Sequence, residues 1–299
     1  MTVSSEIRYR RFPEPSALLR LIKPVTWFPP MWAYLCGAIS VGVSLIGQIE
    51  LILLGLVLCG PVVCGMSQAA NDWCDRHVDA INEPDRPIPS GRVPGRWGLW
   101  VAIAMSILAL CLGALLGIWG FGATIVGVIA AWAYSAEPVR LKKSGIWGPG
   151  LVGLCYEGLP WFTGAAVLSA AAPAWPTIIL AFVYAIGAHG IMTLNDFKAV
   201  KGDLQTGVRS LPVVLGPRLA AFVACFIMLA AQLLVVGLLI SWQRSEHAFA
   251  IVFLMVSQVF AMRVLFRDPA KKAPWYNGVG VTLYVIGMMI SAFAVRGLS

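Results

Sequence analysis

The segment LILLGLVLCGPVVCGMSQAANDWCDRHVD, residues 51–79, joins a long apolar run to a stretch rich in acidic side chains. An amide and three carboxylates stand at Asn71, Asp72, Asp75 and Asp79. Steps of three, four and seven residues return to one face of an α-helix, so these side chains would point the same way. Folding alone gives no reason to gather like charges, whereas a divalent cation removes their repulsion. Mg²⁺ takes one or two carboxylates and completes its shell with water and phosphates, so the motif predicts a magnesium–diphosphate site.

The composition indicates a membrane protein. The chain has 299 residues, of which 59% are hydrophobic and 12% are charged, whereas a soluble domain carries about 25% charged residues. A helix needs ~20 apolar residues to cross a bilayer, and the apolar segments are too long and continuous for barrel strands. The predicted fold is an all-α polytopic bundle in the lipid bilayer. Its nine candidate spans are residues 25–46, 51–70, 97–117, 119–135, 147–168, 173–194, 217–241, 247–266 and 274–295.

The distribution of basic residues predicts how the bundle lies in the membrane. A net charge of +8 is compatible with nucleic-acid binding, but all of the 22 Lys and Arg residues except Arg244 and Arg296 fall in the N-terminal arm and in alternate loops. The positive-inside rule then places the N-terminus in the cytoplasm and the C-terminus outside. We therefore expect no nucleic-acid partner. Residues 1–23 form a basic arm without the features of a removable signal peptide, and residues 24–299 form the transmembrane domain.

A weak internal repeat suggests that the site is divided between two halves of the chain. GMSQAAND, residues 65–72, is echoed by GIMTLND, residues 190–196, and RPIP, residues 86–89, by RSLP, residues 209–212. The two copies occupy residues 65–96 and 189–218, and four predicted spans separate them, so both acidic ends emerge on one side. Parallel repeats place a site at the interface of their halves. The second copy contributes Asp196 and Asp203, two helical turns apart.

Basic and aromatic residues in the same loops complete the candidate site. Metal ions would neutralise the inner oxygens of a diphosphate, and Arg or Lys would contact the outer ones. For any single basic residue the alternative is a topology signal or a lipid-headgroup contact. The candidates for diphosphate binding, besides Asn71, are Arg86, Tyr134, Arg140, Lys142, Lys198 and Arg209.

These motifs resemble those of a known family. Asn71-Asp72-x-x-Asp75-x-x-x-Asp79 is similar to the first aspartate motif of the UbiA-type intramembrane prenyltransferases. YSAEPVRLK, residues 134–142, and GVRS, residues 207–210, resemble further signatures of that family. Three longer strings resemble the chlorophyll and bacteriochlorophyll synthases, and of these two the bacteriochlorophyll branch more: KPVTWFPP at residues 23–30, VDAINEPDRPIPSG at 78–91, and YEGLPW at 156–161.

The resemblance implies nine transmembrane helices around a central cavity, in a cytoplasmic or photosynthetic membrane. It also implies transfer of a geranylgeranyl or phytyl group from its diphosphate to the propionate of a Mg-tetrapyrrole acid, bacteriochlorophyllide, with Mg²⁺ as cofactor. Asn71, Asp72, Asp75 and Asp79 match the first metal motif, and the three aspartates and Asp203 would be catalytic. The second motif departs from the common spacing, because Ala199 stands where many members have an aspartate. The second metal site is then either Asp196 with Asp203, or Asp203 alone.

Two ionisable residues inside predicted spans are further candidates. Charged or titratable side chains within a span are uncommon and usually face a cavity. Glu157 would position the macrocycle or the prenyl cation, or else serve helix packing. His189 would ligate the central Mg²⁺ of the pigment, or else be a hydrogen-bonded structural histidine.

Other acceptors and other classes of protein stay open at this point. Within the transferases, the acceptor is alternatively chlorophyllide or 4-hydroxybenzoate. A secondary transporter or Mg²⁺ transporter is a different reading, since repeats and membrane carboxylates occur there too, but the acidic residues gather at one surface and not along a path. A pigment-binding assembly factor is a third reading.

Overall fold

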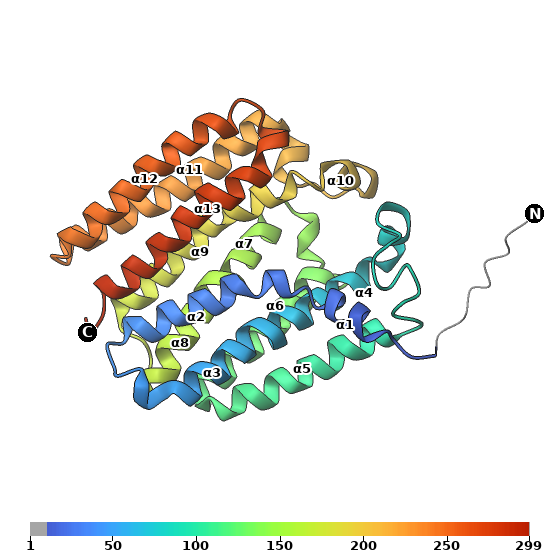
Figure 1. Ribbon diagram of the computed structural model, residues 1–299, viewed down its shortest axis with the longest axis horizontal. Helices are drawn as coiled ribbons and strands as arrows, with labels where there is room; N and C mark the ends of the chain where they lie inside the picture. The colour runs from blue at the N-terminus through green and yellow to red at the C-terminus, as the bar shows by residue number, and fades with distance from the viewer. Residues whose placement is uncertain (1–10, 299) are drawn as a thin grey trace, which may run out of the picture.

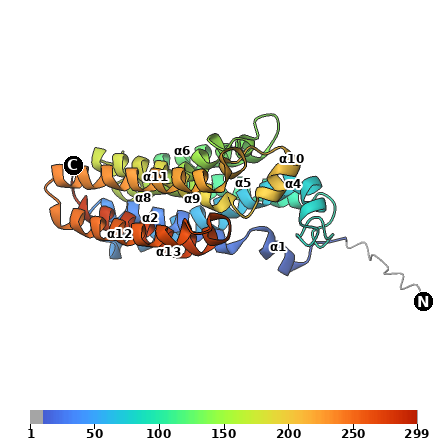
Figure 2. The ribbon, with the colours of Figure 1, turned by 90° about the horizontal axis from the view of Figure 1, so that it is seen from above.

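The computed structural model describes residues 11–298, so residues 1–10 of the predicted N-terminal arm, and Ser299, lie outside the described part. Within that part the secondary structure is helical, apart from one isolated parallel bridge between Ser144 and Arg209. The helices lie side by side in an elongated bundle (Figures 1 and 2). The end of the bundle that carries α1 (Pro15–Leu21) also carries α10 (Val200–Thr206), and the C-terminus lies at the opposite end.

Eight of the nine predicted spans correspond to helices long and apolar enough to cross a membrane, counted over residues 11–298. The first is one continuous helical run, Ile46–Asn82, made of α3 (Ile49–Val57), a π-helical segment η3 (Leu58–Cys64) and α4 (Gly65–Asn82). Another is α7 (Trp147–Gly153), the π-helical η5 (Leu154–Gly158) and α8 (Leu159–Ser169). The remaining six are α5 (Trp97–Leu115), α6 (Gly117–Ser135), α9 (Trp175–Asp196), α11 (Leu211–Ser241), α12 (Ser245–Leu265) and α13 (Pro269–Ala294).

The predicted span at residues 25–46 is shorter than expected. Its helix, α2 (Phe28–Ser40), has 13 residues and is therefore roughly 20 Å long, less than the ~30 Å hydrocarbon core. Proline fixes its start, at Pro29, and the chain leaves it at Gly42, where φ is +80°; both are the expected helix boundaries for these residue types. The helix nevertheless runs through the bundle and packs against α8 and α13.

Prolines also explain the two π-helical segments. Pro61 lies inside η3, and Pro160 follows η5 at the start of α8. Each lacks an N–H and its ring clashes with the carbonyl four residues earlier, so the regular hydrogen-bond ladder cannot continue through it. Wider π turns take up the misfit without ending the helix.

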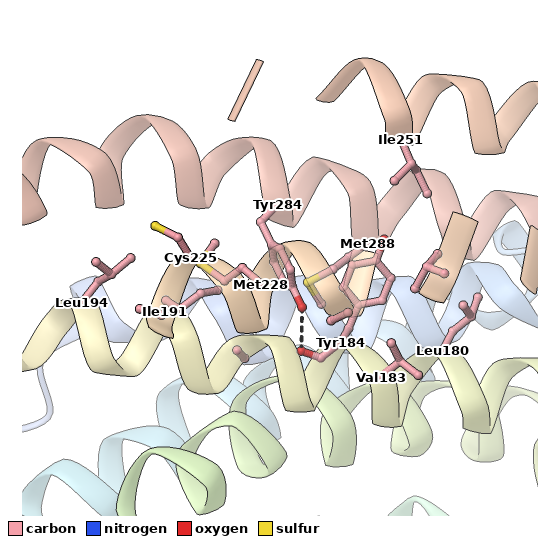
Figure 3. Close-up of a cluster of buried hydrophobic side chains, with 14 of the residues drawn as sticks. Leu180, Val183, Tyr184, Ile191, Leu194, Cys225, Met228, Ile251, Tyr284 and Met288 are labelled. Atoms are coloured by element: carbon pink, nitrogen blue, oxygen red, sulfur yellow. Dashed lines mark hydrogen bonds between the residues drawn. The ribbon is translucent and has the colours of Figure 1, made fainter. Parts of the chain in front are cut away.

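Small and polar residues hold the helices together, as expected where lipid tails are as apolar as the core. Central helix α9 packs on α7, α11 and α13. The hydroxyl of Tyr284 on α13 donates to the carbonyl of Tyr184 on α9 over 2.9 Å (Figure 3). The hydroxyl of Tyr184 lies 2.8 Å from Ser291 Oγ. An ideal Cβ on Gly190 would lie 2.3 Å from the Ala224 carbonyl oxygen, so α9 and α11 approach as closely as a glycine allows.

We therefore expect Gly190→Ala to lower the free energy of unfolding by about 1–3 kcal/mol, because the added methyl group meets backbone that cannot move aside. Thermal unfolding in detergent, followed by circular dichroism, measures the loss. Gly237→Ala on α11 is the matched control, since a Cβ there meets nothing within 4 Å. Equal stability of the two variants would contradict the close helix contact.

Candidate functional site

The acidic motif occupies the last three turns of α4. Basic residues that precede it and follow it in the sequence neutralise its carboxylates. Lys23, just before the first membrane helix, places its Nζ 2.7 Å from Asp72 Oδ1. Arg86, in the loop after α4, bridges two acids: its Nη1 lies 3.4 Å from Asp72 Oδ1 and 2.9 Å from Asp79 Oδ2. Asp72 is buried, with 1% of its surface exposed. The shared guanidinium shows that Asp72 and Asp79 lie on one face of the helix, as the spacing predicts.

Asp75 is held by a different loop. Arg140 Nη2 lies 2.9 Å from Asp75 Oδ1, and Lys142 Nζ contacts Asp75 Oδ2. Both cations come from the loop that follows α6. Burial lowers the pKa of the Lys142 ammonium, and the Asp75 carboxylate opposes that shift. Arg140 has a left-handed backbone, with φ of +35°, and so does Lys23, with φ of +45°. Such conformations are strained for residues with a Cβ and are concentrated at functional sites.

The second acidic stretch meets the first at the same end of the bundle. Asp196 ends α9, and Asp203 lies in α10, where Ser210 Oγ donates to Asp203 Oδ2 over 2.6 Å. Burial raises the pKa of the Asp203 carboxyl, while Ser210 and Lys142 oppose the shift. An ideal Cβ on Gly202 of α10 would lie 3.4 Å from Asn82 Nδ2 at the end of α4. The two halves of the repeat therefore touch.

The loops of the two halves are joined as well. The backbone N–H of Arg209 donates to the Lys143 carbonyl over 3.1 Å, next to the Ser144–Arg209 bridge. Gly145 makes this possible, because a Cβ there would lie 2.5 Å from the Arg209 carbonyl oxygen. Tyr134, at the end of α6, lies near enough to Asp75, Asp196 and Asp203 to interact electrostatically with acids of both halves.

Other predicted site residues are placed less centrally. Asn71 Nδ2 makes a long, 3.5 Å contact with Ser135 Oγ. Lys198 and Arg209 are exposed and form no ion pair with residues 11–298. Glu157 is buried in η5, and its Oε2 finds no hydrogen-bond partner in the described part of the chain. His189 Nδ1 lies 3.4 Å from Thr193 Oγ1, and the ring also contacts the backbone of Ile146, near α7.

Sequence reasoning missed three residues at the site. Lys23 was grouped with the topology-setting charges, although it stands alone beside a proline at the start of the membrane domain. Ser210, which donates to Asp203, lies inside the recognised RSLP string, and only its contact was missed. Asn277 on α13 donates from Nδ2 to Asn195 Oδ1 over 2.8 Å. No pattern in the sequence connects residues so far apart, so Asn277 was not foreseeable.

The carboxylates suit a hard cation, although they do not form a closed cage. Asp72 Oδ2 is buried without a hydrogen-bond partner among residues 11–298, and the Asp196 carboxylate makes no hydrogen bond or ion pair within that range. No three Asp, Glu, His or Cys side chains of the described residues converge tightly enough to hold a metal ion by themselves. Mg²⁺ needs only one or two carboxylates when phosphates and water complete its shell, so the residues present fit that ion.

Helices that cross the membrane, with acids and cations gathered at one end, define a multi-pass integral membrane protein of the kind that handles anionic substrates at the bilayer surface. The profile described as "UbiA prenyltransferase family" matches residues 26–293. The chain belongs to this family and is a prenyltransferase, which removes the transporter and the assembly factor from consideration.

The chain is also similar to individual proteins of known name. The "Bacteriochlorophyll synthase 33 kDa chain" of Cereibacter sphaeroides is 67% identical over 298 residues, covering 100% of this chain and 99% of the relative. "Chlorophyll synthase, chloroplastic" of Oryza sativa is 35% identical over 286 residues, covering 92% of this chain and 76% of the relative. The structure of a UbiA homolog from Archaeoglobus fulgidus bound to GPP and Mg²⁺ shares the fold, with a TM-score of 0.71 and 20% identity over 94% of this chain and 100% of that one.

Removing the guanidinium that bridges two acids should destabilise the metal-free protein. For Arg86→Ala we expect a loss of about 1–3 kcal/mol, less than for a fully buried pair because the side chain is 26% exposed. Added Mg²⁺ should restore part of that loss, because it neutralises the same carboxylates. Melting temperatures with and without Mg²⁺ measure both effects. Arg96→Ala, at an exposed position in the same loop, is the control; an Mg²⁺ response no larger than that of unchanged protein would argue against a metal beside Asp72.

Proposed function

We propose that this prenyltransferase moves a geranylgeranyl or phytyl group from its diphosphate to the propionate carboxylate of bacteriochlorophyllide, releasing pyrophosphate, with Mg²⁺ as cofactor. The observation that carries the proposal is the 67% identity, over the full length of both chains, to a bacteriochlorophyll synthase. Identity to the rice chlorophyll synthase is 35%, so chlorophyllide is the weaker candidate acceptor. The site supports the choice of a prenyl diphosphate as donor, since it brings together acids that suit a metal ion and cations that suit a diphosphate.

The cations around α4 would be the groups that receive the diphosphate. Lys23, Arg86, Arg140 and Lys142 each contact a carboxylate that would otherwise bind metal. Bound Mg²⁺ would act as a Lewis acid that stabilises the departing pyrophosphate. The basic side chains would then turn from the carboxylates to the outer phosphate oxygens, where charge builds up as the allylic bond breaks. Tyr134 lies near acids of both halves and would be close to a diphosphate that bridges them.

The acceptor needs little activation. A propionate is already ionised near pH 7 on reference values for carboxylic acids, so no strong general base is required. The carbocation-like prenyl group must instead be kept from water, which would hydrolyse it. The bundle interior below the acids supplies mainly apolar side chains. Glu157 and His189 lie within that interior and remain candidates for contacts with the macrocycle.

The proposal extends to location and to the division of the chain. By the positive-inside rule, the basic loops on the side of the acidic motifs support a site at the cytoplasmic face of a cytoplasmic or photosynthetic membrane, with the C-terminus outside. Residues 24–299 would form the catalytic domain with its two repeats, and residues 11–23, the described part of the predicted arm, would lie at the same face. We assign the second metal site to Asp196 with Asp203, because the two carboxyl groups lie near enough to interact electrostatically and α10 approaches the end of α4 at Gly202.

An assay with competing acceptors tests the function. Purified protein in lipid nanodiscs is given geranylgeranyl diphosphate and Mg²⁺ with bacteriochlorophyllide, chlorophyllide or 4-hydroxybenzoate, and products are separated by chromatography. We expect esterified bacteriochlorophyllide to form fastest. Turnover of the phenolic acid alone would rule out a tetrapyrrole acceptor, and repetition with phytyl diphosphate identifies the preferred donor.

Loss of either central aspartate should stop the reaction without affecting membrane insertion. For Asp72→Ala and Asp75→Ala we expect transfer to fall by about 100-fold or more, because the charge on the leaving pyrophosphate is no longer stabilised. Product formation per milligram of membrane-inserted protein measures the effect. Asp85→Ala removes an exposed carboxylate from the adjacent loop and should retain activity; full activity in Asp72→Ala or Asp75→Ala would refute the metal site.

A further inference from the structure

A small polar network lies inside the bundle, directly below the acidic motif. Gln68 Nε2 on α4 donates to the hydroxyl of Tyr156 in η5 over 3.1 Å. The same hydroxyl lies 3.3 Å from Cys64 Sγ. Cys64 in turn donates to the Thr26 carbonyl over 3.3 Å, and Thr26 Oγ1 donates to the Lys23 carbonyl over 2.8 Å. The network therefore links the helical run Ile46–Asn82 with η5 and with the short 3-10 helix η1 (Pro24–Thr26). Gln68, Tyr156, Cys64 and Thr26 have no role in the mechanism so far.

The network lies where the reacting carbon of a bound prenyl diphosphate must be. Gln68 precedes Asp72 by four residues, which places it on the same face of α4, about 6 Å deeper in the bundle. Lys23 connects the two levels, because its ammonium binds Asp72 while its carbonyl accepts from Thr26. The diphosphate would occupy the upper level and its first prenyl carbon the lower. An attacking atom has to stand within about 3–3.5 Å of that carbon.

Both donors have capacity to spare. Gln68 carries two N–H groups, and Tyr156 takes one of them. The Tyr156 hydroxyl lies 3.3 Å from Cys64 Sγ, and sulfur is a weak acceptor. A carboxylate is a much stronger acceptor, so the Tyr156 hydroxyl would donate to it in place of the Cys64 sulfur. Both side chains are half-buried.

The local backbone is irregular on both sides of this contact. Cys64 is the last residue of η3, and Tyr156 lies within η5, so the two π-helical segments meet at the Cys64–Tyr156 contact. Pro61 and Pro160 cause these segments, as described above. π turns inside α-helices are frequent at functional sites, where they aim a side chain that a regular turn would direct elsewhere.

The neutrality of the pair matches the chemistry of the acceptor. A carboxylate loses its charge as it bonds to the prenyl carbon. A cation at this position would hold the ground state more tightly than the transition state and slow the reaction. Neutral N–H and O–H donors orient the carboxylate, and they lose less interaction energy than a cation would as the charge disappears.

We propose that Gln68 and Tyr156 form the subsite that binds the carboxylate of the acceptor and points it at the first prenyl carbon. The inference rests on the proposed function, since it requires a carboxylic-acid acceptor. It assigns Cys64 and Thr26 to positioning the Tyr156 hydroxyl.

Two variants test the subsite with an acid and a matched amide. Bacteriochlorophyllide is the substrate, and its propionamide analogue, which cannot be esterified, is the inhibitor; geranylgeranyl diphosphate and Mg²⁺ are saturating. Tyr156→Phe should raise KM for the acid about 10- to 100-fold, the effect of losing one hydrogen bond to a charged group, with little change in KM for the diphosphate. Gln68→Glu keeps the size of the side chain but adds a negative charge, so it should weaken the acid at least as much while the amide retains its inhibition constant.

Tyr34→Phe is the matched control. It deletes the same atom from a buried tyrosine whose hydroxyl donates to the Leu51 carbonyl over 3.0 Å, away from the acidic motif. We expect its acid-to-amide preference to equal that of unchanged protein. If Tyr156→Phe does not fold, Gln68→Glu alone decides between the outcomes.

The results separate this inference from the function on which it rests. Ester formation with an unaltered acid-to-amide preference in Gln68→Glu would overturn the subsite and leave the proposed function intact. A rise confined to KM for the diphosphate would assign Gln68 and Tyr156 to binding of the prenyl donor, and would overturn the subsite too. Absence of any esterified tetrapyrrole with unchanged protein would overturn the proposed function, and the subsite with it.

Discussion

Buried carboxylates at the end of a membrane helix are the constraint on which the rest of this structure depends. Removing one ion from water costs several kcal/mol, and leaving it unpaired is strongly destabilising. Asp72 is buried, and Asp75 and Asp79 lie on the same turns of α4. Their cations come from three segments: the residues before α2, the loop after α4 and the loop after α6. Pairing with this one short motif therefore fixes the positions of these three segments at the end of the bundle.

The sequence predicted the features that follow from local chemistry. Hydrophobic length identified the membrane helices, because each must satisfy its own backbone in lipid, and the spacing of Asp72 and Asp79 identified their common face. Contacts between distant segments were not predictable. Lys23 and Asn277 meet their partners across 49 and 82 residues, and nothing local distinguishes them. Charge alone did not define the contacts either, since Lys198 and Arg209 are exposed and form no ion pair within residues 11–298.

The two halves of the repeat are related in sequence but not in the way they are stabilised. In the first half the acids are paired with Arg and Lys. In the second, Asp203 accepts from a serine hydroxyl and Asp196 has no ion pair within residues 11–298. Asn195, the counterpart of Asn71, is held by an amide from the last helix. The carboxylates of the second half thus have fewer competing cations, so a metal ion that binds there displaces fewer ion pairs.

The ion pairs of α4 would also make the two proposed ligands, the metal ion and the diphosphate, depend on each other. A metal ion binding alone must push Lys23, Arg86 or Arg140 off the carboxylates and leave those cations without a counter-charge. A diphosphate binding alone must draw the same cations away and leave the carboxylates bare. When both arrive together, each charged group exchanges one partner for another and the local charge stays balanced. Such an arrangement couples the two binding free energies, each ligand raising the affinity for the other by the same factor, and it disfavours occupation by either free magnesium or a stray phosphate.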